Sequence, residues 1–353
     1  MTKIAVVPGD GIGVEVVRQA VKCLEAAADV VGLELELDEW PLGADRYLET
    51  GTTITDQEMA ALEGDYDAIL LGALGDPRVS DNRHARDILL GLRFRLDLYI
   101  NLRPVRLLDP ALSPLRDVAS TDVDLVIFRE NTEGLYAGVG GNVRKDTDDE
   151  LAIEEDVNTR KGVERIVRAA FAHARFADRD RVTLADKANA MRHAGGLWRR
   201  VFAEVAAEFP EIEHEAVYVD ALALDLVLRP VRYDVIVTAN LFGDILSDLA
   251  AALAGGLGVA PSANLHPGRP GLFEPVHGSA PDLAGQDRAN PFAAILTTAL
   301  MLDDLGHARE ATAVRRAVER AIREDRTTPD LGGALGTEAV GDWIADAVRD
   351  ALR

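Results

Sequence analysis

The sequence predicts an α/β protein with a largely parallel sheet, and three observations support this prediction. Short runs of β-branched and apolar residues alternate with longer segments whose apolar residues recur at helical spacing. Several of these short runs end directly in polar residues, and open α/β sheets bind their ligands beyond the carboxyl ends of the strands. The chain has 353 residues, of which 48% are hydrophobic, so it can form two domains of ordinary size.

The expected elements follow from these runs in order. The first strand covers residues 4–7 and leads through a glycine-rich turn into a helix over residues 14–28. The segment 138–155 is polar, charged and glycine-bearing, which predicts a protruding arm or loop. The pattern is helical from residue 291 to 327, and a final helix follows residue 337. Further strands are expected at residues 33–37, 68–71, 125–128, 182–184, 216–219 and 235–238.

The composition argues against several classes of function. The net charge of −22 disfavours nucleic acid and anionic membranes as partners, although a local arginine cluster can still bind a small acid. No apolar run approaches the length of a membrane span, and the N-terminus lacks a secretory signal pattern. The single cysteine, Cys23, cannot form an internal disulfide or a cysteine-based metal site. We therefore expect a cytoplasmic protein. Its acidity and its excess of arginine over lysine indicate either a GC-rich genome or a high-salt cytoplasm.

The glycine-rich turn at residues 9–13 follows the first strand and is similar to the start of a dinucleotide-binding fingerprint. The third glycine of that fingerprint is replaced here by Val14. The turn therefore indicates either backbone that approaches a ligand closely or an ordinary strand-to-helix connection.

Three arginines are candidates for binding carboxylates. Arg129 immediately follows a fully apolar strand, whereas Arg93 and Arg103 lie in the segments LRFRLD and NLRP. A guanidinium offers a rigid fork of donors that matches a carboxylate, which a lysine does not. For each arginine taken alone, a surface salt bridge is the alternative.

Three aspartates are candidates for binding a divalent cation. Asp244 and Asp248 are four residues apart, so they share one face of a helix, where like charges repel unless a cation lies between them. Asp220 ends the expected strand at residues 216–219. Oxygen-only ligands favour Mg²⁺ or Mn²⁺ over zinc. Helix capping by Asp244 beside a solvated Asp248 is the alternative.

Two further side chains are candidates for proton transfer. Lys187 lies just after the strand at residues 182–184, where nearby charges can lower the pKa of an amine. Tyr136 is a candidate proton donor. An exposed lysine and a half-buried tyrosine without chemical roles are the alternatives.

Taken together, these segments resemble the β-decarboxylating dehydrogenases, the family that acts on isocitrate, homoisocitrate, tartrate or D-malate, and 3-isopropylmalate. The motifs span the whole chain in the family's order. They are PGDGIG at residues 8–13, NLRP at 101–104, RENTEGLY at 129–136, DKAN at 186–189, NLFGDILSD at 240–248 and EPVHGSAPD at 274–282.

The resemblance implies a two-domain fold with a mixed, largely parallel sheet that is not a Rossmann fold. Residues 1–100 and 255–353 would form a large cofactor-binding domain. Residues 101–254 would form a central domain with the dimer interface, and residues 138–155 would be an interlocking arm. The enzyme would be a homodimer whose active sites include residues of both subunits.

The resemblance also implies a role for each candidate residue. Arg93, Arg103 and Arg129 would bind the malate carboxylates. Asp220, Asp244 and Asp248 would bind Mg²⁺ or Mn²⁺, with Asp220 and Lys187 contributed by the neighbouring subunit. Lys187, acting through Asp220 or water, would help remove the hydroxyl proton, and Tyr136 would protonate the product carbanion. The implied cofactor-binding residues are Ile12, Asn189, Glu274, His277, Gly278, Ser279, Ala280, Asp282, Leu283 and Asn290.

The cofactor and substrate follow from two positions in these motifs. Asp282 would accept hydrogen bonds from the adenosine ribose and repel a 2′-phosphate, which implies NAD; NADP-using relatives have a lysine there. Leu89 and Leu90 stand where isocitrate and homoisocitrate enzymes have polar or basic residues. They would enclose an alkyl group, because a carboxylate there would be desolvated without a partner. The resemblance therefore implies oxidative decarboxylation of (2R,3S)-3-isopropylmalate, a step of leucine biosynthesis.

Two observations limit this assignment, and one alternative class has to be weighed against it. Arg86 replaces a glutamate that is common in isopropylmalate enzymes. Enzymes for D-malate or tartrate also carry leucines at these positions, so those acids are the alternative substrates. A non-catalytic regulatory subunit is the alternative class, but such subunits typically lose metal-binding or acid/base residues that this sequence retains.

Overall fold

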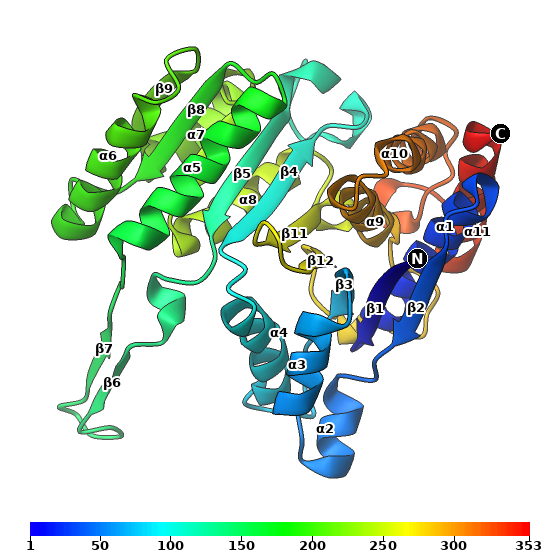
Figure 1. Cartoon of the computed structure of the whole chain (residues 1–353), viewed down its shortest axis with the longest axis horizontal. Helices are drawn as coiled ribbons and strands as arrows, with labels where there is room; N and C mark the ends of the chain where they lie inside the picture. The colour runs from blue at the N-terminus through cyan, green and yellow to red at the C-terminus, as the bar shows by residue number, and fades with distance from the viewer. The chain divides into compact units, whose positions relative to one another are not determined.

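The computed structural model describes residues 1–353 and divides into two compact units. Unit 1 combines residues 1–98, 106–120 and 251–353, and unit 2 combines residues 99–105 and 121–250. Residues 106–120 therefore lie with unit 1, although the sequence analysis places them in the central domain. Each unit is built around five strands of a mixed, largely parallel sheet (Figure 1). The predicted α/β fold class is confirmed.

The sheet of unit 1 is mostly parallel. Its strands lie in the order β2-β1-β3-β12-β11. β1 pairs in parallel with β2 and β3, β12 pairs in parallel with β3, and the β11–β12 pair is antiparallel. The strands are β1 (Thr2–Gly9), β2 (Leu35–Glu39), β3 (Ala68–Ala73), β11 (Pro261–Leu265) and β12 (Gly271–Pro275).

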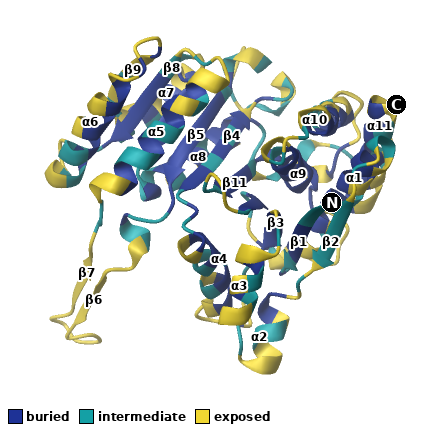
Figure 2. Cartoon of the chain, viewed as in Figure 1, coloured by how far each residue is buried: buried dark blue, intermediate teal, exposed yellow.

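Helices surround this sheet and bury both of its faces. Alternate residues of a strand point to opposite faces, so Ala5 and Val7 of β1 and Ile69 and Leu71 of β3 share one face. These residues belong to a core cluster with apolar residues of α3 and α4 (Figure 2). α1 packs against α11 and α9 elsewhere in the unit. The helices are α1 (Ile12–Val31), α2 (Ala44–Thr50), α3 (Asp56–Gly64), α4 (Arg83–Arg95), α9 (Phe292–Asp304), α10 (Ala308–Arg323) and α11 (Thr337–Leu352).

The sheet of unit 2 has the strand order β4-β5-β10-β8-β9, and the β5–β10, β10–β8 and β8–β9 pairs are parallel. α5 and α6 pack together on one face, and α7 and α8 lie on the other (Figure 1). The strands are β4 (Ile100–Arg106), β5 (Asp124–Glu130), β8 (Arg181–Asp186), β9 (Glu213–Tyr218) and β10 (Val235–Thr238). The helices are α5 (Arg160–Phe176), α6 (Arg192–Ala206), α7 (Val219–Leu228) and α8 (Asn240–Leu253).

A two-stranded antiparallel ribbon extends from unit 2. It consists of β6 (Gly140–Val143) and β7 (Leu151–Glu154), and every residue of both strands is exposed (Figure 2). The ribbon lies within the segment for which the sequence predicts an arm.

One expected strand is placed wrongly. The sequence analysis ends a strand at Val219 and puts Asp220 directly after it. In the structure β9 ends at Tyr218 and α7 begins at Val219, so Asp220 lies in the first turn of a helix. The apolar run misled the prediction because it crosses the boundary between the end of an edge strand and the start of a helix.

No helix combines the length and apolar composition that crossing a membrane requires.

Candidate functional site

The glycine-rich turn after β1 is organised by one buried carboxylate. Asp10 accepts hydrogen bonds from the backbone N–H groups of Ala44 at 2.7 Å and Gly75 at 2.8 Å. Its second oxygen also lies 2.8 Å from Nε2 of His84, which is fully buried in α4. Asp10 therefore connects the end of β1 with the start of α2, the loop after β3 and the start of α4.

The same turn packs tightly against the loop that contains Ser279. The backbone N–H of Ile12 donates a 2.8 Å hydrogen bond to the Ser279 carbonyl. Gly11 has a φ of +55°, and a Cβ at this position would lie 2.1 Å from the Ser279 oxygen. Both the backbone conformation and the close approach therefore require glycine. Two segments that are predicted to bind the cofactor are thus in direct contact.

The loop after β12 has two features that fit a binding site. The Nε2 atom of His277 is buried and has no hydrogen-bond partner, and burial lowers the pKa of the imidazole. Ala280 has a φ of +36°, a conformation that residues other than glycine rarely adopt and that often occurs at functional sites. Both features belong to unit 1.

The other predicted cofactor residues have different surroundings. Asp282 and Leu283 are exposed in a short 3₁₀ helix, and Gly278 lies next to His277 in the loop. Asn290 is buried, donates to Asp330 at 3.0 Å and accepts from the Phe292 N–H at 2.9 Å. Asn189 is an exposed residue of unit 2, in the turn after β8.

α4 presents the predicted substrate residues of unit 1. Arg93 is 6% exposed and forms a 2.8 Å ion pair with Glu274, which also accepts a 2.8 Å hydrogen bond from Asn264. The Nε atom of Arg93 is buried without a hydrogen-bond partner. Leu90 is partly exposed, whereas Leu89 packs against the core of the unit. Leu89 therefore has a packing role as well as its predicted binding role.

Asp87, one turn before these residues, does not carry an isolated charge. Its carboxylate lies 3.4 Å from Nε of Arg83 and 3.6 Å from Nε of Arg86. These two guanidinium groups partly neutralise the negative charge of Asp87.

In unit 2, α8 faces Arg129 with a row of polar side chains. Arg129 follows the apolar part of β5 and is 2% exposed. Its Nε and Nη2 atoms donate to Oδ1 of Asn240 at 3.0 and 2.8 Å, and Nη1 forms an ion pair with Asp244. The helix approaches β5 closely at Gly243, where a Cβ would lie 2.6 Å from the Arg129 side chain.

Arg103 on β4 extends this row by one helical turn. It donates to Oδ1 of Asn101 at 2.7 Å and to Ser247 Oγ at 2.7 Å. Its guanidinium lies 3.5 Å from Asp244 and 3.3 Å from Asp248. Two predicted carboxylate-binding arginines thus converge on two predicted metal ligands. Burial raises the pKa of Asp248, and the neighbouring Asp244 charge adds to that effect while Arg103 opposes it.

Tyr136 joins the same cluster from the segment after β5. Its hydroxyl group donates a 2.8 Å hydrogen bond to Oδ2 of Asp244. The guanidinium of Arg129 lies 5.1 Å from the centre of its ring. Burial, together with the Asp244 hydrogen bond, raises the pKa of the phenol. Tyr136 is therefore protonated at neutral pH, as a proton donor must be.

Lys187 and Asp220 form a separate pair in unit 2. Lys187 makes an ion pair with Asp220, whose side chain is 67% exposed, and this contact lowers the pKa of the Asp220 carboxyl. No group of three or more His, Cys, Asp or Glu side chains within the chain has the geometry of a metal site. Asp244 and Asp248 fit a divalent cation by their oxygen-only chemistry and shared helix face, and a third protein ligand is not adjacent to them.

The sequence analysis misses several residues of these clusters. Asn240 precedes Asp244 by the four-residue spacing that separates Asp244 from Asp248, and Asn101 lies two residues before Arg103 on the same face of a strand. Both spacings could have identified these amides. Asp10 and His84 are 74 residues apart, and no local pattern connects them.

Comparison with known proteins identifies the class of this fold and site. The family model described as isocitrate/isopropylmalate dehydrogenase matches residues 3–344. A protein named 3-isopropylmalate dehydrogenase from Thermobifida fusca (strain YX) is 48% identical over 350 residues, which cover 99% of this chain and 98% of that protein.

Two solved structures extend the similarity to three dimensions. The crystal structure of isocitrate dehydrogenase from Methylococcus capsulatus has a TM-score of 0.87 at 40% sequence identity and covers 99% of this chain and 100% of that chain. A β-decarboxylating dehydrogenase from Thermococcus kodakarensis has a TM-score of 0.82 at 37% identity and covers 99% of this chain and 97% of that chain. The fold and these similarities define an α/β dehydrogenase. The chain belongs to the isocitrate/isopropylmalate dehydrogenase family.

Proposed function

We propose that this enzyme oxidises and decarboxylates (2R,3S)-3-isopropylmalate to 2-oxoisocaproate and CO₂ with NAD as oxidant, a step of leucine biosynthesis. The observation that carries the proposal is the sequence of α4, where Leu89 and Leu90 precede the buried Arg93. The name of the Thermobifida fusca relative supports the same substrate.

The substrate carboxylates would be bound by Arg93, Arg103 and Arg129. All three side chains are at least nine-tenths buried, so their charges act where water screens them little. The buried Nε of Arg93 has no hydrogen-bond partner, so it would be able to donate to an oxygen of a bound ligand. An isopropyl group beside Leu90 would gain about 2 kcal/mol by burial.

Asp244, Asp248 and the neighbouring subunit's copy of Asp220 would hold Mg²⁺ or Mn²⁺. The cation, when bound, would polarise the substrate hydroxyl and its neighbouring carboxylate and stabilise negative charge that develops there. Lys187 contacts Asp220 directly, so it would help to remove the hydroxyl proton, through that carboxylate or through water, as hydride passes to NAD.

Tyr136 would donate the proton to the carbon that loses CO₂. Its raised pKa keeps the phenol protonated, and its hydrogen bond to Asp244 holds the hydroxyl group beside the arginine cluster until a cation competes for that carboxylate. The resulting phenolate of Tyr136 would then regain a proton from solvent and become neutral again.

NAD would bind to unit 1 along the turn that contains Ile12 and the loop of residues 277–283, with Glu274 beneath this loop and Asn290 at the adenine. The unpaired Nε2 of His277 and the strained backbone of Ala280 support a ligand here. The exposed Asp282 would accept hydrogen bonds from the ribose hydroxyls. Asn189 would contact the nicotinamide side.

The active enzyme would be a homodimer. Unit 2 exposes several large apolar side chains on α7 and α8: Leu224 is 60% exposed, Leu228 is 64% exposed and Ile245 is 57% exposed. The ribbon of β6 and β7 also exposes large apolar side chains, at Val143, Leu151 and Ile153. Exposed apolar surface of this extent marks protein contacts, and a second copy would cover it and bring Lys187 and Asp220 to the neighbouring site.

Dimer formation can be tested by one substitution and a matched control. Leu228→Glu should dissociate the enzyme in light-scattering measurements and abolish its activity. Leu48→Glu, which alters a 48% exposed leucine of α2, should leave a fully active dimer. A fully active Leu228→Glu monomer would disprove the sharing of sites.

The substrate is tested by measuring kcat/KM for 3-isopropylmalate, D-malate, tartrate, isocitrate and homoisocitrate under identical NAD and Mg²⁺. We expect 3-isopropylmalate to be preferred, with D-malate about 10- to 200-fold poorer because it lacks only the alkyl group. Isocitrate should be rejected more strongly. A preference for D-malate or tartrate would mean that the leucines only pack, and a preference for isocitrate would overturn the interpretation of α4.

A further inference from the structure

Arg199 of α6 connects the two backbone segments that carry Lys187 and Asp220. Its Nε and Nη2 atoms donate to the carboxylate of Asp186 at 2.5 and 3.1 Å. Its guanidinium also lies 4.9 Å from the ring centre of Tyr218. Asp186 and Tyr218 are the last residues of β8 and β9 and are paired in the register of the two strands. One side chain therefore spans the ends of both strands.

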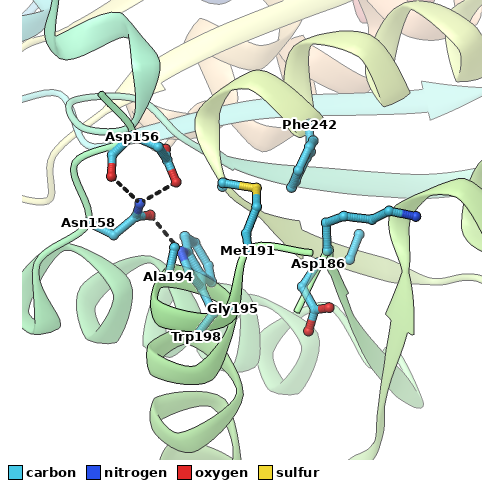
Figure 3. Close-up of a pocket in the computed structure, with 11 residues that line it drawn as sticks. Asp156, Asn158, Asp186, Met191, Ala194, Gly195, Trp198 and Phe242 are labelled. Carbon is cyan, nitrogen blue, oxygen red and sulfur yellow. Dashed lines mark hydrogen bonds between the residues drawn. The ribbon is translucent and has the colours of Figure 1, made fainter. Parts of the chain in front are cut away.

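The first of these contacts fixes the turn that bears Lys187. Asp186 is 4% exposed, and its carboxylate also accepts a 2.9 Å hydrogen bond from the Ala188 N–H. α6 presses on the same turn, since a Cβ at Gly195 would lie 2.5 Å from Cα of Ala188. Asp186 borders a small pocket with Met191 and Phe242, which is also lined by Lys187 (Figure 3).

The second contact fixes the start of α7. Tyr218 is the residue that precedes this helix, and Asp220 follows it by two positions. The Lys187–Asp220 pair is itself exposed, with side chains 28% and 67% accessible, and exposed ion pairs are weak and poorly ordered. Its geometry therefore depends on the backbone on either side of it and on Tyr218, whose ring centre lies 6.0 Å from Nζ of Lys187.

We propose that Arg199 is a positioning residue that holds Lys187 and Asp220 as one preassembled unit for the neighbouring active site. This inference rests on the proposed function. Arg199 acts through Asp186 and Tyr218 and touches no reacting atom. Its fork fits the carboxylate while its flat face packs on the tyrosine ring, and lysine cannot do both.

The experiment compares Arg199→Gln with Arg199→Lys, Tyr218→Leu and Tyr218→Phe in the full-length enzyme. Arg199→Gln should lower kcat about 10- to 100-fold, since small displacements of catalytic groups cost this much. Arg199→Lys should rescue only part of the loss. Tyr218→Phe should be impaired less than Tyr218→Leu, because it keeps the ring face and loses only the contact between the phenol oxygen and Arg199.

Arg175→Gln is the matched control. Arg175 forms a 2.6 Å ion pair with Glu211 and lies 4.3 Å from the ring centre of Phe209, so this variant loses the same kinds of contact on α5. Its kcat should remain that of the wild type.

Two further measurements separate positioning from a loss of folded protein. The Mn²⁺ dissociation constant, measured by calorimetry without substrate, should rise in Arg199→Gln because Asp220 is displaced. The deuterium isotope effect on kcat with substrate labelled at C2 should also increase as chemistry becomes slower. Partial unfolding would change neither quantity per active site.

Lys187→Ala distinguishes the failure of this inference from the failure of the proposed function. If Lys187→Ala abolishes turnover while Arg199→Gln keeps the wild-type kcat and Mn²⁺ affinity, Arg199 is not a positioning residue and the function stands. If Lys187→Ala retains wild-type turnover, the role of Lys187 is wrong and the inference is overturned with it.

Discussion

The hydroxyl group of Tyr136 donates a 2.8 Å hydrogen bond to the carboxylate of Asp244. The proposed proton donor is thus directly connected to a proposed metal ligand, which is also paired with Arg129. Occupation of the site by a cation would compete for the Asp244 oxygens and release the phenol toward the substrate. Tyr136 would then protonate the product carbon only when the cation is bound.

The role of Tyr136 can be tested with Tyr136→Phe. We expect kcat to fall about a hundredfold or more, because one positioned acid is lost, while the NAD dissociation constant stays unchanged. Steady-state kinetics and fluorescence titration with NADH measure the two quantities. Tyr66→Phe is the control, since Tyr66 donates a similar 2.9 Å hydrogen bond to Asp38 in unit 1, and neither residue has a proposed role in catalysis. Wild-type turnover in Tyr136→Phe would show that the phenol is structural.

Asp244→Asn should abolish turnover and greatly weaken Mn²⁺ binding, because an amide replaces a charged ligand. The melting temperature should change little, since the amide oxygen can still accept from Arg129 and the amide N–H can donate to the Tyr136 hydroxyl in its place. Calorimetric Mn²⁺ titration and thermal unfolding measure these effects. Asp303→Asn on α9, which removes a 2.6 Å ion pair with Arg315 of α10, is the control for the lost charge. If Asp244→Asn remains active, the aspartates of α8 are not metal ligands.

Asp282→Lys should shift the enzyme from NAD toward NADP. The carboxylate repels a 2′-phosphate, whereas an ammonium group in the same exposed position attracts it. The ratio of kcat/KM for NAD to that for NADP should fall by at least about tenfold. Asp346→Lys, an exposed site on α11, makes the same change in net charge. If both variants change this ratio equally, the overall electrostatic field of the protein, and not a contact between residue 282 and the ribose, controls the cofactor preference.

The melting temperature of the wild-type enzyme should rise from low to molar KCl, and the rise should be steep if the protein is adapted to a high-salt cytoplasm. A net charge of −22 destabilises the compact state by self-repulsion, and salt screens this repulsion within a few ångströms at molar concentration. Calorimetry across the KCl series measures the effect. A flat profile would mean that the acidity does not limit stability.

Glu58 should contribute pH-dependent stability through its two contacts with Arg46 at 2.7 and 2.8 Å. The Arg46 guanidinium holds the pKa of Glu58 at about 2 in the folded protein, compared with 4.5 for an unperturbed glutamate. A lowered folded-state pKa stabilises the protein above pH 4.5, and this stabilisation disappears as the pH falls toward 2. Urea unfolding should therefore show Glu58→Gln to be less stable at pH 7 and similar to wild type near pH 2. A stability difference between Glu58→Gln and wild type that stays the same from pH 7 to pH 2 would contradict this role of Glu58.

Continuous apolar runs made the buried parallel strands predictable. β10 has the bounds that the sequence predicts, and β3 and β5 extend only slightly beyond theirs. β9 was misplaced because it is an edge strand that begins with the polar residues Glu213, His214 and Glu215, which interrupt the apolar pattern. β11 and β12 were missed because they are short and contain asparagine, glutamate and proline.

The candidate site was predictable where one helix or strand sets the spacing of its residues. Asp244 and Asp248 share a face of α8 as their four-residue separation requires. The contact between Arg199 and Tyr218 could not be foreseen, because it depends on how two parallel strands end beside a helix. The pairing of Arg93 with Glu274 joins residues 181 positions apart, which no local pattern encodes.

The packing of α1 against α11 has a consequence for synthesis on the ribosome. The Sγ atom of Cys23 lies 3.8 Å from the Gly341 carbonyl, and these residues are 318 positions apart. At about 5–20 residues per second, the second helix emerges about 15–60 s after the first. Residues 121–250 are contiguous in unit 2 and can fold within that interval. The part of α1 that packs against α9 and α11 meanwhile stays uncovered, so slower translation between α1 and α11 prolongs the nascent chain's exposure to aggregation and its need for chaperones.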